Sequence, residues 1–368
     1  MKYLELDTPA LLIDREILMK NLSFMQGYAD KHNVRLRPHT KTHKMPFIAH
    51  LQADMGAHGI AVAKVGEAEV MAKSGMKDIF IANQIVGKQK LERILALSEK
   101  IQISFGADTP CQVEAAEEVF SKAGSIAQVL IEIEVGENRS GIIEEKDFID
   151  LIDTFRACPH VHFKGIYSHD GNSYSASDIQ ECINISVLAQ KRTLHFAAVA
   201  EAFGMPCETI SYGSTPTLMN AANIIPGITE IRPGTYALMD ASQGNAIGTL
   251  ARCAATVLST VISRPTAERV ILDVGAKGLT MQERTEGISA TIGKGTLLDD
   301  PNIHISKVFD EHAIIYNSDF REKIHIGDKV RIIPVHICPV CNLYDTAWLI
   351  SDDEVIKEIP IEGRGKLV

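Results

Sequence analysis

Short runs rich in strand-forming residues alternate with amphipathic stretches from residue 35 to about residue 240. Several of these runs, such as IFIAN and VLIEIEV, are nearly continuous in apolar residues. That pattern is typical of parallel strands that helices cover on both faces. It predicts eight strands, over residues 35–39, 59–63, 78–83, 102–107, 127–136, 162–170, 208–213 and 230–240.

The amphipathic segments between these runs predict helices. The segment before the first run places four apolar residues on one face at helical spacing: Leu18, Leu22, Met25 and Ala29. A longer segment near residue 178 opens with Ser177 and Gln180 in a capping-box pattern. Its predicted apolar face carries Ile179, Ile183 and Val187.

Eight strand–helix units predict a (β/α)8 TIM-type barrel, because a doubly wound sheet would use fewer strands. After about residue 245 the chain changes to strand-like runs separated by turns rich in glycine, proline and aspartate. That part contains no convincing helix and predicts a mostly antiparallel β domain. We therefore expect an α/β chain with a barrel over residues 10–243 and a β domain over residues 244–368, packed with residues 1–9. The strand-like piece at residues 8–14 is compatible with either part.

Composition narrows the class of protein. The chain has 368 residues, 45% of them hydrophobic, and its formal net charge of −10 argues against a nucleic-acid surface. No apolar run is long enough to cross a membrane, and acidic residues interrupt the N-terminal segment where a signal peptide would be apolar. Seven scattered cysteines indicate free thiols. We expect a cytoplasmic protein that binds neither nucleic acid nor membrane.

The end of the first predicted strand carries the unusual polar sequence RPHTKTHK. Such a segment is either a solvated basic loop or a site, and in a barrel the sites lie where strands end. Cationic neighbours and partial burial would lower the pKa of a lysine there, so that its neutral amine can form a Schiff base. Physical reasoning leaves Lys41 and Lys44 as alternatives, with Lys41 nearer the strand end.

Later strand ends carry further polar groups. Arg139 follows the fifth strand and could anchor an anion, and His169 lies between Tyr167 and Tyr174 at the end of the sixth strand. A histidine and two tyrosines at one strand end favour a site over a purely structural role. Arg232 and Tyr236 are at the end of the eighth strand.

Gly213, Ser214 and Thr215 follow the seventh strand. Small residues with hydroxyl groups between a strand and a helix suit a phosphate, although the same residues also serve as an ordinary helix cap.

The segment PVHICPVCN in the second part contains a candidate metal pair. Residues two apart on a strand face the same way, so His336 and Cys338 can bind one ion. An imidazole and a thiolate favour Zn²⁺ or a similar divalent metal. A single histidine or a single cysteine more often has a buried structural role. Because no second Cys/His pair follows Cys341, an open site is favoured over a closed structural one.

Six segments together, RPHTKTHK, GENRSG, GIYSHDGNSY, GSTPT, EIRPGTY and HICPVCN, resemble one known family. It comprises the metal-activated, fold-type III pyridoxal-phosphate enzymes that include D-threonine aldolase, D-3-hydroxyaspartate aldolase and eukaryotic-type D-serine dehydratase, and that are relatives of alanine racemase. The resemblance extends over nearly the whole chain. It implies a barrel followed by a β domain, assembled as a homodimer with active sites near the interface.

The resemblance also implies roles for individual residues. Lys41 would be the Schiff-base lysine, Arg139 would contact the phenolic oxygen of the cofactor, and Arg232 would lie near the pyridine nitrogen. The phosphate would be held by Gly213, Ser214 and Thr215, with Tyr236 nearby, and Tyr167 and Tyr174 are further candidates for cofactor binding. His336 and Cys338 would bind Zn²⁺, or Mn²⁺ or Mg²⁺, which holds the β-hydroxyl of the substrate.

We therefore expect a lyase of the D-threonine aldolase type, which cleaves small D-3-hydroxy-amino acids to glycine and an aldehyde, with His169 as the base. D-serine dehydratase chemistry, giving pyruvate and ammonia, is the alternative. The H-x-C-P motif is similar to the dehydratases, whereas VGEAEV and IANQIVG are similar to the bacterial aldolases. Asn172 stands where many relatives have histidine. An amino-acid racemase or a pyridoxal-phosphate carrier protein fits less well, because neither needs a metal motif.

Overall fold

The computed structural model describes residues 1–368. Eight parallel strands form one sheet in the order β2-β9-β8-β7-β6-β5-β4-β3. A parallel bridge between His39 and Ala61 joins the segment after β2 to β3, so the two edges of the sheet meet. The strands are β2 (Arg35–Leu36), β3 (Ile60–Val62), β4 (Asp78–Gln84), β5 (Gln102–Ala107), β6 (Ala127–Ile133), β7 (Val161–Ser168), β8 (Thr209–Tyr212) and β9 (Glu230–Ile231). All eight predicted strands are present, several of them shorter than predicted.

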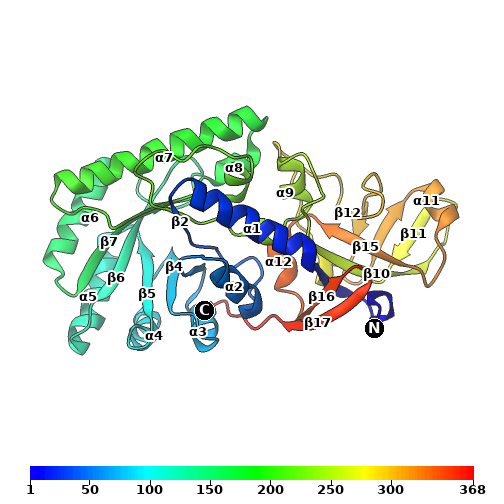
Figure 1. The fold of residues 1–368 in the computed structure, drawn as a ribbon, viewed down its shortest axis with the longest axis horizontal. Coiled ribbons are helices and arrows are strands. Elements are labelled where there is room, and N and C mark those ends of the chain that lie inside the picture. The colour runs from blue at the N-terminus through cyan, green and yellow to red at the C-terminus, as the bar shows by residue number, and fades with distance from the viewer.

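Helices surround this sheet (Figure 1). They are α1 (Arg15–Lys31), α2 (Pro46–Asp54), α3 (Val65–Lys73), α4 (Lys88–Ser98), α5 (Pro110–Ala123), α6 (Glu145–Ala157), α7 (Ile179–Ala202) and α8 (Thr215–Met219). The predicted apolar face of α1 is buried as expected: Leu18, Leu22, Met25 and Ala29. The side chain of Asp14 caps this helix by accepting a hydrogen bond from the Ile17 N–H.

The predicted cap and apolar face of α7 are wrong. Asp178, and not Ser177, is the N-cap, because its carboxylate accepts a hydrogen bond from the Glu181 N–H at 2.8 Å. Cys182 and Ser186 lie on the buried face, whereas Ile179 is 47% exposed. The buried face of α7 is therefore displaced by one residue from the face that carries its most apolar residues.

A second, nine-stranded sheet follows the barrel, with the order β13-β14-β11-β10-β1-β16-β17, while β15 pairs with β10 and β12. Only the pair of β1 with β16 is parallel. The strands are β1 (Ala10–Asp14), β10 (Ala255–Ser263), β11 (Arg269–Leu272), β12 (Gly295–Leu297), β13 (Lys307–Val308), β14 (Ala313–Tyr316), β15 (Lys329–Pro334), β16 (Thr346–Ser351) and β17 (Glu354–Pro360). The predicted fold class, a barrel followed by a mostly antiparallel β domain, is confirmed.

Two details of the second part differ from the prediction. β1 belongs to the nine-stranded sheet, although the expected bounds counted residues 10–14 with the barrel. Short helices also occur where none was expected, because one or two helical turns are too short to give a periodic pattern: α9 (Ala241–Ala246), α10 (Ala276–Leu279), α11 (Ser318–Lys323) and α12 (Ile337–Cys341).

The barrel and the second sheet lie side by side along the long axis of the molecule, with α12 at their boundary (Figure 1). One cluster of 84 buried residues runs through both parts, so they share a continuous core. The last residues return to the barrel, where the Gly66 N–H donates to the Val368 carbonyl at 2.9 Å. No helix combines the length and the apolar character that crossing a membrane requires.

Candidate active site

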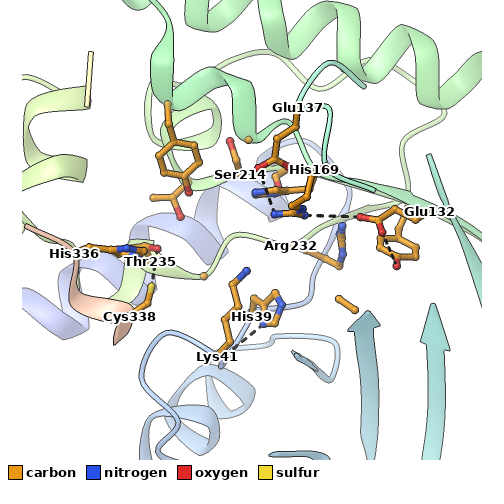
Figure 2. A pocket seen from close by; sticks show the side chains of 18 of the residues that line it. His39, Lys41, Glu132, Glu137, His169, Ser214, Arg232, Thr235, His336 and Cys338 are labelled. Atoms are coloured by element: carbon orange, nitrogen blue, oxygen red, sulfur yellow. Dashed lines mark hydrogen bonds and ion pairs between the residues drawn. The ribbon is translucent and has the colours of Figure 1, made fainter. Parts of the chain in front are cut away.

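A polar cavity lies at the carboxyl ends of the barrel strands, against α12 and Arg284 of the second part. Of the twelve site residues predicted from the sequence, eleven line it: Lys41, Arg139, Tyr167, His169, Tyr174, Gly213, Ser214, Thr215, Arg232, His336 and Cys338. Lys41 points into the cavity, with His336 and Cys338 on one side and Arg232 and Glu132 on the other (Figure 2). The fold therefore brings together side chains from positions 41 to 338.

Tyr236 is the predicted site residue that does not line the cavity. Its side chain is fully buried, and its hydroxyl accepts a hydrogen bond from Gln52 of α2 at 2.9 Å. The sequence prediction assumed a strand up to residue 240, but β9 ends at Ile231. Pro233 follows immediately and the chain turns into the short helix η3 (Thr235–Ala237), which packs Tyr236 into the core.

Lys41 and Lys44 have different surroundings. Burial lowers the pKa of Lys41, and the positive charge of Arg139 lowers it further, against the opposing influence of Cys338. Lys44 instead forms an ion pair with Glu67 at 2.9 Å, and both side chains are buried. Lys41 therefore loses its proton at a lower pH than an ordinary lysine, and its neutral amine is available in the cavity.

A buried carboxylate, Glu132 of β6, organises one wall of the cavity. It accepts hydrogen bonds from the Ser140 hydroxyl at 3.0 Å and from the Tyr167 hydroxyl at 3.3 Å. Arg139, which is half exposed, lies 3.8 Å from Glu132 and 3.3 Å from Glu137. These contacts place the Arg139 guanidinium at the rim of the cavity.

Arg232 lies deeper in the cavity. Its guanidinium donates to the Ser168 carbonyl at 2.7 Å and lies 5.1 Å from the centre of the Tyr167 ring. Its Nε is buried and has no hydrogen-bond partner in the protein. Since a buried donor without an acceptor is costly, this atom indicates that a ligand with an acceptor atom belongs here.

The loop after β8 provides a second unpaired donor. Gly213 has a φ of +124°, which L side chains rarely adopt, and this conformation turns the chain into α8. The Thr215 hydroxyl is buried without a partner, and Ser214 lies beside it in the cavity wall. Hydroxyl groups and a tight glycine turn form the kind of pocket that holds a phosphate.

His169 is a neutral imidazole in the cavity wall. Burial lowers its pKa well below 6.5, and the charges of Lys41 and Arg139 act in the same direction. Its Nδ1 lies 3.2 Å from the Gly213 carbonyl and must donate to it, which leaves Nε2 without a proton. His169 can therefore accept a proton at Nε2. The neighbouring Asn172 does not line the cavity.

His336 and Cys338 line the cavity together, but not for the reason the sequence suggested. β15 ends at Pro334, and His336 is the residue that precedes α12, with Cys338 in its first turn. Asp240 fixes the start of this helix by accepting a hydrogen bond from the Ile337 N–H at 2.9 Å. The pair therefore lies on a helix terminus and not on one face of a strand.

The donor atoms of this pair are suited to a metal ion. His336 Nδ1 lies 2.9 Å from the amide oxygen of Gln282, so Nδ1 donates and Nε2 is left without a proton. Burial also lowers the pKa of His336 and keeps the ring neutral. Cys341 is buried outside the cavity, and no group of three or more His, Cys, Asp or Glu residues is arranged to hold an ion. An ion here would keep positions for water or substrate.

Five further cavity residues with polar side chains were not predicted from the sequence: His39, Glu132, Glu137, Thr235 and Arg284. Glu132 had a detectable signal, since it is a carboxylate inside a mostly apolar strand, where charged residues are rare. Arg284 lies in a turn-rich segment without periodicity, so no signal marked it.

Two families and several solved structures are similar to this chain. The sequence profile described as alanine racemase, N-terminal domain, matches residues 13–242, and that of a serine dehydratase domain matches residues 254–350. A D-threonine aldolase from an Arthrobacter species is 32% identical over 363 residues, which cover 98% of this chain and 93% of the relative.

The crystal structure of D-threonine aldolase from Filomicrobium marinum has a TM-score of 0.89 at 28% identity and covers 100% of this chain and 98% of its own. D-threo-3-hydroxyaspartate dehydratase from Delftia sp. HT23 has a TM-score of 0.91 at 27% identity, with 98% of each chain covered. A variant of that dehydratase with one cysteine replaced by alanine is described in the metal-free form.

Proposed function

The chain belongs to the family of alanine racemase-like pyridoxal-phosphate lyases that includes D-threonine aldolase and D-serine dehydratase, and from this premise we propose that it cleaves D-3-hydroxy-amino acids to glycine and an aldehyde. The observation that carries the proposal is a lysine of lowered pKa and a metal-type His/Cys pair lining one cavity. The lysine alone would equally suit a racemase. A metal ion on His336 and Cys338 would add a binding position for a substrate side chain that carries a hydroxyl group.

The cavity fits pyridoxal phosphate. The unpaired Thr215 hydroxyl, with Ser214 and Gly213, would hold the phosphate, and the unpaired Arg232 Nε would face the ring. Lys41 would hold the aldehyde carbon and Arg139 the phenolic oxygen, while Tyr167 and Tyr174 complete the walls. When bound, the cofactor supplies an electron sink for the bond that breaks in the substrate.

His336 and Cys338 would hold a divalent metal ion, Zn²⁺ or alternatively Mn²⁺ or Mg²⁺. The neutral imidazole and the cysteine of the pair support this, as does the metal-free cysteine variant of the related dehydratase. When bound, the ion would lower the pKa of the β-hydroxyl group of the substrate. His169, with its unprotonated Nε2, would then take the proton from the hydroxyl oxygen.

Dehydration of the same substrates is the second candidate function. The segment around Cys338 favours it, because its H-x-C-P motif is similar to that of the dehydratases. In that reaction Lys41 would remove the Cα proton, and hydroxide would leave from Cβ. Both reactions use the same residues, and the orientation of the substrate bonds decides between them.

On family resemblance we also propose that the protein forms a homodimer. A measurement of its molar mass in solution tests this.

The experiment is to incubate the purified protein with D-threonine and with D-serine, each with and without a chelator. Glycine and acetaldehyde from D-threonine support the aldolase, whereas pyruvate and ammonia from D-serine support the dehydratase. Turnover that continues at the same rate with the chelator contradicts the metal role of His336 and Cys338. The absence of turnover on either substrate contradicts the proposed function.

A further inference from the structure

Arg284 is a cation of the cavity that neither the cofactor nor the metal accounts for. The Arg139 guanidinium contacts Glu132 and Glu137, and Arg232 donates to a backbone carbonyl. The Arg284 guanidinium has no carboxylate partner, and its Nε is buried without any acceptor. An unpaired guanidinium that is partly removed from water is unfavourable unless an anion reaches it.

The segment that carries Arg284 is held firmly against the barrel. The Ile288 N–H donates to the Ala176 carbonyl at 2.7 Å, and the Ser289 hydroxyl donates to the Tyr174 carbonyl at 2.6 Å. A Cβ atom on Gly287 would lie 2.3 Å from the Ser175 carbonyl carbon, so only glycine permits this close approach. These contacts fix the segment that follows Arg284 against the barrel side of the cavity.

Two contacts place Arg284 near the end of the cavity that holds the His/Cys pair. Its guanidinium lies 5.2 Å from the centre of the Tyr174 ring, which also lines the cavity. Gln282, two residues earlier, is hydrogen-bonded to His336 at 2.9 Å. A substrate whose β-hydroxyl lies at His336 and Cys338 thus carries the rest of its side chain toward Arg284.

We propose that Arg284 binds a carboxylate on the side chain of the substrate, so that the preferred substrates are D-3-hydroxy dicarboxylic amino acids of the 3-hydroxyaspartate type. This inference rests on the proposed function. A guanidinium and a carboxylate form two parallel charge-assisted hydrogen bonds, which a methyl group cannot replace. In 3-hydroxyaspartate the hydroxyl and this carboxylate are on the same carbon, which matches the proximity of Arg284 to the His/Cys pair.

The products follow from the bonds involved. The Cα–Cβ bond breaks and its electron pair passes to Cα, which takes up a proton to give glycine. The β-hydroxyl loses its proton, and its C–O bond becomes the carbonyl of glyoxylate. A reaction that consumes glyoxylate or supplies a hydroxylated dicarboxylic amino acid would therefore be its metabolic neighbour.

The test compares kcat/KM for 3-hydroxy-D-aspartate and D-threonine in the wild-type holoenzyme and in Arg284→Met, Arg284→Lys and Lys294→Met. Lys294 is a matched control because it lies near Arg284 in sequence but pairs with Glu283 outside the cavity. We expect the wild type to favour 3-hydroxy-D-aspartate, and Arg284→Met to lose about 10- to 100-fold on that substrate. D-Threonine should change by less than about 3-fold, as should both substrates in Lys294→Met. Arg284→Lys should recover part of the loss.

Binding gives a readout that does not depend on turnover. Isothermal titration calorimetry of D-aspartate and D-2-aminobutyrate should show tighter binding of D-aspartate, and Arg284→Met should remove that difference. An equal loss on both substrates and both ligands would show that Arg284 binds the α-carboxylate or only supports the fold, and would overturn the inference. Turnover of neither substrate, with the D-aspartate preference intact, contradicts the proposed function and leaves the Arg284 assignment standing.

Discussion

Lys44 Nζ lies 2.9 Å from a carboxylate oxygen of Glu67, and the two side chains are only 8% and 4% exposed. The Lys44 amine is thus engaged by a protein carboxylate and lies outside the cavity, where it cannot reach a bound aldehyde. Lys41 lies three residues earlier, lines the cavity and has a lowered pKa. The two lysines that the sequence left as alternatives therefore have different surroundings, and these support Lys41 as the cofactor lysine.

The first prediction concerns these two lysines. Lys41→Ala should abolish the visible absorbance band of the lysine-bound cofactor and all turnover, because no other amine lines the cavity. Lys44→Met is the matched control and should retain the band, although it should unfold more easily because Glu67 loses its partner. Absorbance spectra of the two variants after reconstitution decide the matter. Loss of the band in Lys44→Met, with retention in Lys41→Ala, would reverse the assignment.

The second prediction concerns the proton acceptor. His169→Gln should keep the cofactor band and lower kcat by about 10²- to 10⁴-fold, which is the usual contribution of a general base. Because burial holds the pKa of His169 well below 6.5, its ring is neutral at pH 6.5 and above. The acid limb of the wild-type kcat/KM profile that disappears in the variant should therefore lie below pH 6.5. A limb at higher pH that disappears in His169→Gln would contradict this role.

The third prediction concerns the orientation of His336. Its Nδ1 donates to Gln282, which leaves Nε2 free to bind the proposed metal ion. Gln282→Leu should weaken metal binding by about 10- to 100-fold, as is usual when the partner of a metal-binding histidine is removed. Gln282→Glu keeps an acceptor at this position and should bind metal more tightly than Gln282→Leu. Competition with a chelating dye measures the dissociation constants. Unchanged affinity in Gln282→Leu would mean that His336 does not need this partner, or does not bind the ion.

The sequence predicted the barrel and most of the cavity because both depend on strand periodicity. Parallel strands that are buried on both faces have continuous apolar runs, and the polar residues that follow each run meet at one end of a barrel. Lys41, Arg139 and Ser214 follow predicted strands and His169 lies at the end of one, and all of them line the cavity. The number of strands and the positions of their carboxyl ends were enough to predict that these residues meet.

What the sequence did not predict lies where the backbone leaves the regular pattern. Tyr236 follows a proline and a glycine that end β9, so its direction depends on a turn and not on a period of two. His336 and Cys338 face one cavity across the start of a five-residue helix, which is too short to be detected by periodicity. Arg284 depends on long-range hydrogen bonds between two parts of the chain. Such contacts have no local signal in the sequence.

The fourth prediction concerns the group of buried charges just before the Lys41 segment. Arg37 Nε lies 2.8 Å from Glu230 of β9, and Arg37 Nη1 lies 2.7 Å from Asp78 of β4. Burial by itself would raise the pKa of Glu230 and of Asp78, but the charge and hydrogen bonds of Arg37 outweigh it and lower both values. These contacts join the segment directly after β2 to strands β4 and β9, near the point where the barrel closes.

A carboxylate whose pKa is lower in the folded state stabilises the fold above its unfolded pKa, and this contribution is lost as the pH falls through the folded pKa. Arg37→Met should therefore reduce the free energy of unfolding by about 3 to 5 kcal/mol at pH 7, because the buried carboxylate of Glu230 and the partly buried carboxylate of Asp78 lose their partner. The difference from wild type should shrink as the pH falls below about 4.5, where both carboxylates begin to take up protons in the unfolded chain. Urea denaturation at a series of pH values measures this, with Arg156→Met as the control, since Arg156 forms an exposed pair with Asp153. A difference that stays constant between pH 7 and pH 3.5 would show that Arg37 stabilises the barrel by packing and not through its two carboxylate partners.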